Sequence, residues 1–486
     1  MNATLVADVV REVMQRLEAP SPRHAGSAAT QPSHSTGSAP SASAEAGRYG
    51  VYATVEQAVA AATEAQKQLL KLSMDDRERI IRLVKRMAKD NARPWGRMEF
   101  DETRIGRLDH KIQKLEIIEL VPGTEYLRTV AHSGSNGVAL DEFAPFGVIG
   151  AITPVTHSVP TLTANFLAMV AAGNTIVFNA HPSGANCAAH AVREYNKAIA
   201  AEFGIENIAC VIHPPTLRTA AELFQAKGIN LLVVTGGPAV ARAALESKKR
   251  AIVAGPGNPP VVVDETADLD NAARSIVAGG GYDNNLLCIG EKQVFVVESV
   301  FEAFAAALRR HKAHWLSAQQ VQALTRKAFT TDEKTGKPHL TKDLVGKDTT
   351  ELAAAAGASI APGIDLLVGE TNKDHPFVQE EQMMPFVPVV RCRNVDEAID
   401  WAVESEHGFR HTAIIHSRNL DNITRFGRLA NTTLFIVNGA SMSGLGLDGE
   451  GYLSYSIATP TGEGVTTPLT FTRFRRVMMT GALRMI

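Results

Sequence analysis

Short apolar runs alternate with helical patterns through the middle of the chain, and this alternation constrains the fold most. The runs cover residues 146–153 (FGVIGAIT), 173–180 (GNTIVFNA), 230–237 (NLLVVTGG) and 259–265 (PPVVVDE). Helical patterns follow the first three runs, at residues 162–172, 184–201 and 239–245. Apolar strands separated by helices are typical of a parallel sheet with helices on both faces. The sequence therefore predicts an α/β fold in which a dinucleotide binds at the carboxyl ends of the strands.

Residues 231–245 (LLVVTGGPAVARAAL) carry the best signal for a phosphate-binding turn. An apolar strand leads into Gly236 and Gly237, and Pro238 stands where a helix would begin. Free N–H groups at a helix start bind phosphate, although a buried strand leading into a packed helix leaves the same pattern. The G-x-G-x-x-G match at 444–449 (GLGLDG) is rejected as a dinucleotide fingerprint because no helical pattern follows it.

Cys288 stands in a stretch rich in glycine and asparagine, residues 279–297 (GGGYDNNLLCIGEKQVFVV). The stretch predicts a loop that leads into a strand at 294–297. A free cysteine is most often a small buried apolar residue, and that interpretation applies here. Glycine and asparagine also allow close backbone approach, which suits a reactive thiol at a pocket edge with a backbone N–H directed at its reaction centre.

Composition excludes several classes of function. With 486 residues, of which 45% are hydrophobic and 21% charged, the chain is long enough for two or three globular domains. The net charge of −2 and the 6% aromatic content favour a small-molecule substrate over a nucleic acid. The four cysteines lie far apart, so neither a disulfide framework nor a metal site is expected, and a reducing compartment is indicated. No apolar run approaches ~18 residues, so no membrane span is expected.

The N-terminal residues differ from the rest of the chain. Residues 3–18 (ATLVADVVREVMQRLE) place their large apolar residues on one stripe, which predicts an amphipathic helix within 1–19. Asp8, Arg11 and other charged residues interrupt the run, so a secretory signal or a mitochondrial presequence fits badly. Residues 20–47 consist mainly of Ser, Ala, Gly and Pro and predict a disordered linker.

A series of segments resembles, in order, the aldehyde dehydrogenase superfamily, and within it the CoA-acylating enzymes of bacterial microcompartments. The segments are PFGVIGAITP, GNTIVFNAHPSGA, VVTGGPAVAR, AGPGNPPVVVDETADLDNAA, GYDNNLLCIGEKQVFV, EEQMMPFVPVV, GFRHTAIIHS and TPTGEGVTTPLTFTR. The resemblance implies a Rossmann-like parallel-sheet cofactor domain at 48–253 with 445–465 returning to it, an α/β catalytic domain at 254–444, and bridging segments for oligomerisation at 128–142 and 466–486.

The resemblance also implies the roles of individual residues. Cys288 matches the catalytic nucleophile, whose thiolate adds to an aldehyde and lets hydride pass to a nicotinamide. The cofactor-binding residues implied by the resemblance are Ile152, Thr153, Pro154, His181, Thr235, Gly236, Gly237 and Glu381. Glu381 matches the carboxylate that binds the nicotinamide ribose; the alternative is a solvated acidic pair with Glu380. No metal is implied.

Three further positions bear on the reaction. Ala254 stands where hydrolytic members of the family carry a glutamate that activates water, so the resemblance implies a thiol acceptor, CoA. Thr156 and His157 stand where close relatives usually carry an asparagine, and are implied to contact the oxyanion or substrate; a loop histidine turned to solvent is the alternative for His157. His411 matches a family histidine near the pocket, and a packing role is equally open.

Taken together, the resemblance implies oxidation of a C2–C3 aldehyde, such as acetaldehyde, propionaldehyde or lactaldehyde, with CoA and NAD, or NADP in its place. The alternatives are a hydrolytic or semialdehyde-type NAD(P) enzyme and a non-catalytic cargo protein with the same fold. Residues 1–18 are expected to act as an encapsulation peptide that binds shell proteins. The expected location is the lumen of a microcompartment in the bacterial cytoplasm, and the expected assembly is a homo-oligomer, dimeric or tetrameric.

Overall fold

A computed structural model describes residues 48–331, 336 and 338–483. The predicted N-terminal helix (1–19) and linker (20–47) lie outside these described residues. The first sheet has six parallel strands, as the apolar runs predict. Its order is β1 (Val51–Tyr52), β6 (Ala209–Ile212), β5 (Thr175–Ala180), β4 (Val148–Thr153), β7 (Leu231–Thr235) and β8 (Ala251–Ala254).

Helices cover both faces of this sheet, because successive strand residues point to opposite sides. One face packs against α2 (Val55–Leu69), α8 (Leu217–Gln225) and α9 (Pro238–Glu246). The other packs against α3 (Met74–Asp90), α6 (Ser158–Ala171) and α7 (Ala185–Phe203), and α6 is buried along its whole length. Helices α4 (Ala92–Thr103) and α5 (Leu108–Glu116) pack beside one another on the same side.

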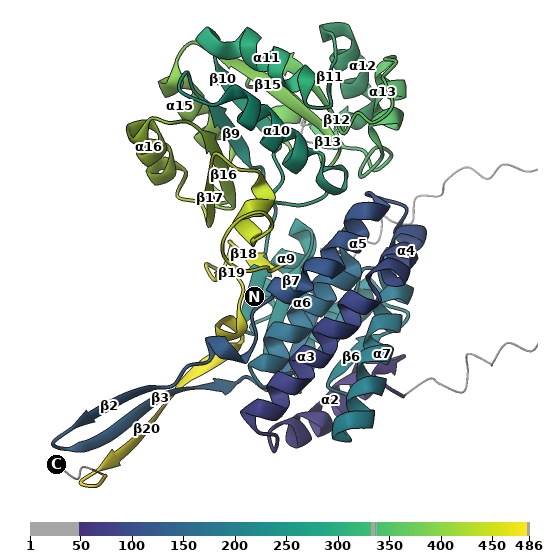
Figure 1. The fold of residues 1–486 in the computed structure, drawn as a ribbon. Coiled ribbons are helices and arrows are strands. Elements are labelled where there is room, and N and C mark those ends of the chain that lie inside the picture. The colour runs from purple at the N-terminus through teal and green to yellow at the C-terminus, as the bar shows by residue number, and fades with distance from the viewer. Residues whose placement is uncertain (1–47, 332–335, 337, 484–486) are drawn as a thin grey trace, which may run out of the picture. The chain divides into compact units, whose positions relative to one another are not determined.

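The second sheet has seven parallel strands. Its order is β11 (Ala313–Trp315), β14 (Leu366–Thr371), β15 (Phe386–Cys392), β10 (Gln293–Val297), β9 (Pro260–Val263), β16 (Thr412–His416) and β17 (Leu434–Val437). Helices α10 (Leu269–Gly280) and α11 (Phe301–Arg310) cover one face, and α15 (Val395–Ser405) and α16 (Leu420–Ala430) cover the other. Two parallel sheets with helices on both faces confirm the predicted α/β fold class (Figure 1).

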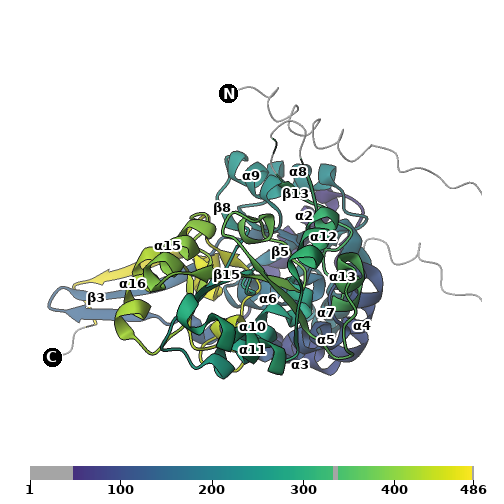
Figure 2. The ribbon, with the colours of Figure 1, turned by 90° about the horizontal axis from the view of Figure 1, so that it is seen from above.

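A three-stranded antiparallel ribbon extends from the body formed by the two sheets (Figures 1 and 2). It joins β2 (Val130–Gly134), β3 (Gly137–Pro145) and β20 (Thr472–Thr480), which contain much of the sequence predicted as bridging segments. The boundaries of the domains themselves stay a prediction. Within the described ranges, no helix has both the length and the apolar character needed to cross a lipid bilayer.

Strand register aligns the strand ends within each sheet. Thr153 pairs with Ala180 and Thr235 with Ala254, so β4, β5, β7 and β8 end at the same edge. In the second sheet, Gln293 pairs with Pro260, so the segments that precede β9 and β10 lie together at the amino-terminal edge. The carboxyl edge of the first sheet is the position at which open α/β sheets bind ligands.

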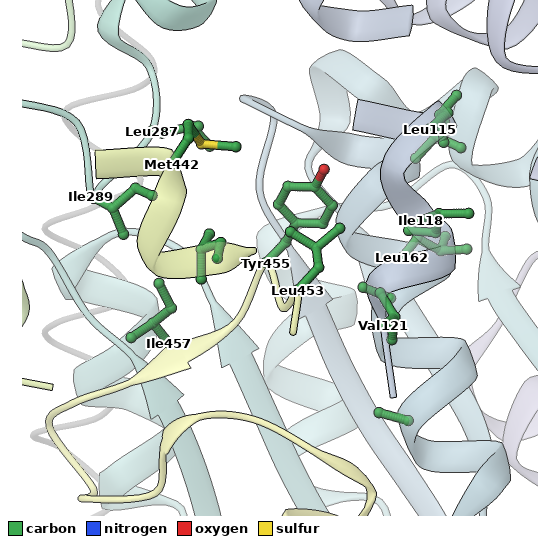
Figure 3. Close-up of a cluster of buried hydrophobic side chains, with 14 of the residues drawn as sticks. Leu115, Ile118, Val121, Leu162, Leu287, Ile289, Met442, Leu453, Tyr455 and Ile457 are labelled. Atoms are coloured by element: carbon green, nitrogen blue, oxygen red, sulfur yellow. The ribbon is translucent and has the colours of Figure 1, made fainter. Parts of the chain in front are cut away.

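The segment around Cys288 is anchored in the main hydrophobic core. Leu287 and Ile289, its neighbours in sequence, are buried in the cluster that also contains Met442 and Tyr455. Figure 3 shows Leu287 and Ile289 on the side of Met442, with Tyr455 lying between them and Leu115 of α5. The thiol is therefore carried by a segment whose two neighbouring side chains are fixed by packing.

The structure corrects one detail of the predicted loop before Cys288. Gly279 and Gly280 do not belong to a loop but end helix α10, and the 3-10 turn η4 (Tyr282–Asn285) follows. A Cβ atom at Gly279 would lie 2.0 Å from a carboxylate oxygen of Glu291. Glycine is thus required in the last turn of this helix by close packing rather than by chain reversal.

Candidate active site

All predicted catalytic and cofactor-binding residues line one pocket of about 510 Å³. They are Ile152, Thr153, Pro154, Thr156, His157, His181, Thr235, Gly236, Gly237, Cys288 and Glu381. The residues of this set from Ile152 to Gly237 lie at the ends of strands of the first sheet or directly after them. Cys288 and Glu381 instead precede strands β10 and β15 of the second sheet. The pocket is therefore formed by residues from both sheets.

The turn between β7 and α9 gives this pocket an open helix N-terminus. A Cβ atom at Gly237 would meet no atom within 4 Å, and no side chain caps α9, which starts at Pro238. The free N–H groups of its first turn therefore remain available to an anionic ligand. Thr235 Oγ1 lies 2.6 Å from Ser456 Oγ, and this hydrogen bond joins the turn to the C-terminal segment.

The part of the pocket lined by α8 and α9 is apolar and partly exposed. Leu217 of α8 is 40% exposed and lines the pocket together with Val240 of α9. His181 is exposed and accepts a hydrogen bond from the backbone N–H of Ser183 through Nδ1, at 3.1 Å. Partial desolvation of the ring by the surrounding protein, followed by the charge of Lys342, lowers the pKa of His181, so the imidazole is neutral near pH 7. An apolar wall beside polar groups at the rim suits a nucleotide base and its ribose.

Cys288 is the only half-buried cysteine of the four; Cys187, Cys210 and Cys392 are buried. Burial and the nearby Glu381 carboxylate raise the pKa of the Cys288 thiol to about 12. The Lys292 ammonium and the backbone N–H groups of residues 288 and 289 act in the opposite direction. Exposure, rather than a lowered pKa, distinguishes Cys288 from the other cysteines in this structure.

Lys292 is a buried charge that sequence analysis did not identify. Its Nζ donates hydrogen bonds of 2.7 Å to both Asn285 O and Asn285 Oδ1, and one of 3.2 Å to Leu287 O. These bonds fold the segment before Cys288 back onto the start of β10. Burial lowers the pKa of Lys292, and the charges of Glu381 and Cys288 raise it. In the sequence, the only indication of a buried lysine at this position is that Lys292 directly precedes an apolar strand.

Glu381 lies across the pocket and is half-buried. Burial raises the pKa of its carboxyl to about 7, although Lys292 and the Gly257 N–H favour the charged form. The next residue, Gln382, is buried and donates hydrogen bonds to Lys292 O at 2.8 Å and Phe386 O at 2.9 Å. Gln382 thus links this segment to the starts of β10 and β15, and Glu381 faces the pocket rather than forming a solvated acidic pair.

Ala254 ends β8 and lines the same pocket, where it is 7% exposed. The segment that follows is anchored by Asn258, whose Nδ2 donates to Val378 O at 2.9 Å and to Ser405 O at 2.7 Å. Among the described residues that line the pocket, Glu381 is the only carboxylate. Apart from Glu381, the described lining has no acidic side chain that could take the place of a glutamate at position 254.

His157 is 5% exposed, so the alternative of a loop histidine turned to solvent is wrong. Its ring lies 5.6 Å from the Tyr455 ring, between centroids, and its Nδ1 has no hydrogen-bond partner in the protein. Burial, followed by the charges of Lys114 and Lys111, lowers the pKa of His157 well below its usual value. The pocket is therefore lined by a neutral imidazole.

His411 is buried and does not line the pocket. Its Nδ1 lies 2.8 Å from Thr412 Oγ1, and its backbone N–H donates to Glu406 at 2.8 Å. A Cβ atom at Gly257 would lie 2.9 Å from the His411 ring and 2.5 Å from the Cys288 carbonyl oxygen. His411 thus packs behind the backbone that supports Cys288, which favours the packing role.

These features define a class of enzyme. An open helix N-terminus at the carboxyl edge of a parallel sheet suits a dinucleotide. A half-exposed thiol beside that site suits covalent catalysis on a substrate held next to the nucleotide. The fold and the pocket together are those of an α/β enzyme in which a thiol and a nucleotide act on one substrate.

Comparison with known proteins specifies the class further. Residues 38–447 match the aldehyde dehydrogenase family, and the chain belongs to that family. It is 42% identical over 439 residues to the acetaldehyde dehydrogenase (acetylating) EutE of Salmonella typhimurium, covering 90% of this chain and 94% of the relative.

Two solved structures have the same fold. The propionaldehyde dehydrogenase from the Clostridium phytofermentans fucose utilisation bacterial microcompartment aligns with a TM-score of 0.87 at 40% identity, covering 90% of this chain and all (100%) of that one. The propionaldehyde dehydrogenase of Rhodopseudomonas palustris, with bound CoA and an acylated cysteine, aligns with a TM-score of 0.85 at 41% identity, covering 89% and 98%.

Proposed function

We propose that the protein oxidises a C2–C3 aldehyde with NAD and CoA to the acyl-CoA and NADH, through a covalent intermediate on Cys288. It is a CoA-acylating aldehyde dehydrogenase, as its similarity to the acetylating and propionaldehyde dehydrogenases indicates. The observation that carries the proposed mechanism is the placement of Cys288 and Ala254 in one pocket. The pocket offers a nucleophile for the aldehyde and no carboxylate at the position of the water-activating base.

In the proposed reaction, the Cys288 thiol loses its proton to solvent water, and the sulfur adds to the aldehyde carbonyl carbon. The oxyanion of the thiohemiacetal is stabilised by the Cys288 backbone N–H and by the neutral imidazole of His157. NAD, when bound, accepts the hydride that leaves this carbon, and the acyl group remains on Cys288 as a thioester. The CoA thiol then attacks the thioester carbonyl, and Cys288 leaves as the thiolate.

The described residues fit a bound NAD. Gly236, Gly237 and the start of α9 offer free N–H groups to the pyrophosphate, and His181, which lines the same pocket, would hold the adenosine ribose. Glu381 faces the pocket near Cys288, which suits a contact with the nicotinamide ribose. The buried Thr153 Oγ1 has no partner in the protein and can hydrogen-bond the ligand.

The experiment that tests this function measures NADH formation by the purified protein with acetaldehyde, propionaldehyde or lactaldehyde, each with and without CoA. The proposal predicts steady turnover only with CoA, and acyl-CoA as the product. Equal turnover without CoA, with a free carboxylic acid as product, would instead support the hydrolytic alternative. No turnover with any aldehyde, in either direction, would support the non-catalytic cargo alternative.

We infer that the protein forms a homo-oligomer through the β2–β3–β20 ribbon. Phe474 and Met478 on β20 are 60% and 63% exposed, and Val130 on β2 is 51% exposed. Large apolar side chains on an extended ribbon favour association with a second copy of the chain. Light scattering of the wild-type protein and of a Phe474→Lys/Met478→Lys variant tests this inference, which predicts a smaller particle for the variant.

We further infer that residues 1–18 bind shell proteins of a bacterial microcompartment, and that the enzyme works in the lumen enclosed by that shell. Two observations support this inference: the amphipathic pattern of these residues in sequence, and the microcompartment origin of a structural relative with 40% identity. An amphipathic helix on a flexible linker can place its apolar face on a partner at a distance from the enzyme body.

A further inference from the structure

Four charged side chains are buried together beneath the active-site pocket. Lys111 and Lys114 come from α5, Glu99 from α4, and Asp283 from the η4 turn that precedes Cys288. None of the four is more than 1% exposed. Lys111 Nζ lies 3.2 Å from Glu99 Oε1 and 3.4 Å from Asp283 Oδ2, and Lys114 Nζ contacts the same Asp283 oxygen.

One end of this charge cluster holds the loop that carries His157. Lys111 Nζ donates a hydrogen bond to the Thr156 carbonyl oxygen. Glu99 Oε2 accepts a hydrogen bond of 2.9 Å from the Val159 backbone N–H. These two bonds lie on either side of His157, so the backbone around the imidazole is fixed by the buried charges.

The other end of the cluster holds the turn that leads to Cys288. Asp283, Asn284 and Asn285 all have left-handed backbone conformations, with φ of 48°, 55° and 59°. Three consecutive non-glycine residues in this region are strained and need supporting contacts. Asp283 Oδ1 accepts a hydrogen bond of 2.8 Å from the Arg107 N–H, and Asn284 Nδ2 donates one of 2.8 Å to Asp348.

Stability alone does not explain such a cluster. Four buried charges lose their hydration, and an apolar core of the same volume is often as stable. The directional bonds of this cluster do what an apolar core does not: they join the two backbone segments that carry His157 and Cys288, which line the same pocket. Lys111 is the residue that touches both, through the Thr156 carbonyl and the Asp283 carboxylate.

We propose that Lys111 is a positioning residue that fixes the position of the His157 loop relative to Cys288. This inference rests on the proposed function, because it takes Cys288 as the nucleophile and His157 as an oxyanion contact. The charges of Lys111 and Lys114 also help to keep the His157 imidazole neutral. A neutral imidazole donates one N–H and accepts at its other nitrogen.

The test compares two double variants that have the same charge and nearly the same volume. Lys111→Gln/Glu99→Gln replaces the ion pair by two amides and keeps an N–H donor toward the Thr156 carbonyl. Lys111→Met/Glu99→Gln removes that donor. Both leave Lys114 and Asp283 as a balanced pair. The measurements are kcat, the aldehyde KM, the melting temperature, and the rate at which iodoacetamide alkylates Cys288.

The inference predicts a kcat about tenfold to a hundredfold lower for the Met variant than for the Gln variant, because a small misplacement of the reacting groups has that effect. The aldehyde KM and the alkylation rate should agree within about threefold between the two variants, since Cys288 itself stays in place. Equal kcat values would overturn the inference. A parallel loss of alkylation would also overturn it, because Lys111 would then act on Cys288 alone.

A further variant covers the case in which neither double variant folds. Lys111→Arg keeps charge and donors on a longer side chain, which displaces the Thr156 carbonyl; a lower kcat with unchanged alkylation is expected, and an unchanged kcat overturns the inference. Failure of the proposed function gives a different result, because the wild type would then be inactive or Cys288→Ala would remain active. If Cys288→Ala is inactive and the double variants have equal kcat, only the role of Lys111 is wrong.

Discussion

Ala254 and Cys288 line one pocket from two different sheets, Ala254 at the last residue of β8 and Cys288 before the first residue of β10. A side chain at position 254 therefore faces the same pocket as an acyl group on Cys288. A methyl group there leaves water without a base at this position, whereas a thiol, whose pKa lies within reach of neutral pH, needs less help. This relationship links the identity of one residue to the choice between acid and acyl-CoA as product.

The Ala254→Glu variant tests this relationship. A carboxylate at this position should activate water, so the steady-state rate of NADH formation without CoA should rise by about tenfold or more. Ala254→Gln is the matched control, because it has the same size and no basic oxygen. Free acid from propionaldehyde, quantified by chromatography, is the readout. Equal CoA-independent rates for the two variants would show that position 254 does not control the acceptor.

The pH dependence of Cys288 alkylation tests its electrostatic coupling to Glu381. With a thiol pKa of about 12, alkylation by iodoacetamide should rise through pH 10 without a plateau. The charged Glu381 raises that pKa, so Glu381→Gln should be alkylated faster than the wild type at pH 8. Below about pH 6 the wild-type carboxyl, whose pKa is about 7, is protonated, and the two rates should converge.

Peptide mass spectrometry assigns the label in this experiment to Cys288. The buried Cys187, Cys210 and Cys392 serve as internal controls, because their labelling should be slow in both proteins. If Glu381→Gln and the wild type react equally fast at pH 8, the two groups are not coupled as the geometry indicates.

Stability should respond to pH through the buried Glu291. Burial raises the pKa of its carboxyl from about 4.5 to about 7, despite hydrogen bonds from Ser441. The folded state therefore binds this proton more tightly than the unfolded state, and stability is lost as pH rises from 4.5 to 7. Glu291→Gln removes this loss, so its melting temperature relative to the wild type should increase between pH 5 and pH 8.

The exposed Glu298 supplies the control for that measurement. Glu298→Gln should change the melting temperature by the same small amount at both pH values. A difference between Glu291→Gln and the wild type that stays constant from pH 5 to pH 8 would mean that Glu291 titrates normally in the folded protein.

Deletion of residues 1–47 should separate targeting from catalysis. The pocket is formed entirely by described residues from Ile152 onward, so activity with CoA should stay within about twofold of the wild type. Co-purification with microcompartment shells should be lost, and Val9→Asp/Val13→Asp should have the same effect in the full-length chain. Normal packaging of the shortened enzyme, or loss of its activity, would contradict the role of this segment as an address tag.

Much of the fold and the candidate site can be predicted from the sequence because their signals are local. Strands such as β4 and β5 are continuous apolar runs bounded by glycine or polar residues, and the turn at Gly236 is marked by its own composition. The resemblance to a family then supplied positions such as His181 and Glu381, which no local pattern identifies. The structure places all of these residues around one pocket.

The buried charges could not be predicted from the sequence, because their partners are distant along the chain. The α5 sequence LDHKIQKLE resembles a helix with a solvated lysine face. Lys111 and Lys114 are nevertheless buried, because Asp283 packs against them. Asp283 follows Lys114 by 169 positions in the sequence. Lys292 is similar: its hydrogen bonds go to backbone groups of a strained turn that no sequence pattern reveals.

The central claim is that the acyl group passes through Cys288, and the first turnover tests it most directly. The enzyme is mixed rapidly with propionaldehyde and NAD in the absence of CoA, NADH is followed by absorbance, and the intact protein is then weighed by mass spectrometry. The account predicts a fast burst of about one NADH per active site, a propionyl adduct located on Cys288, and release of propionyl-CoA when CoA is added. Cys288→Ala should give neither burst nor adduct. Steady NADH formation without a burst, or a burst retained by Cys288→Ala, would contradict it.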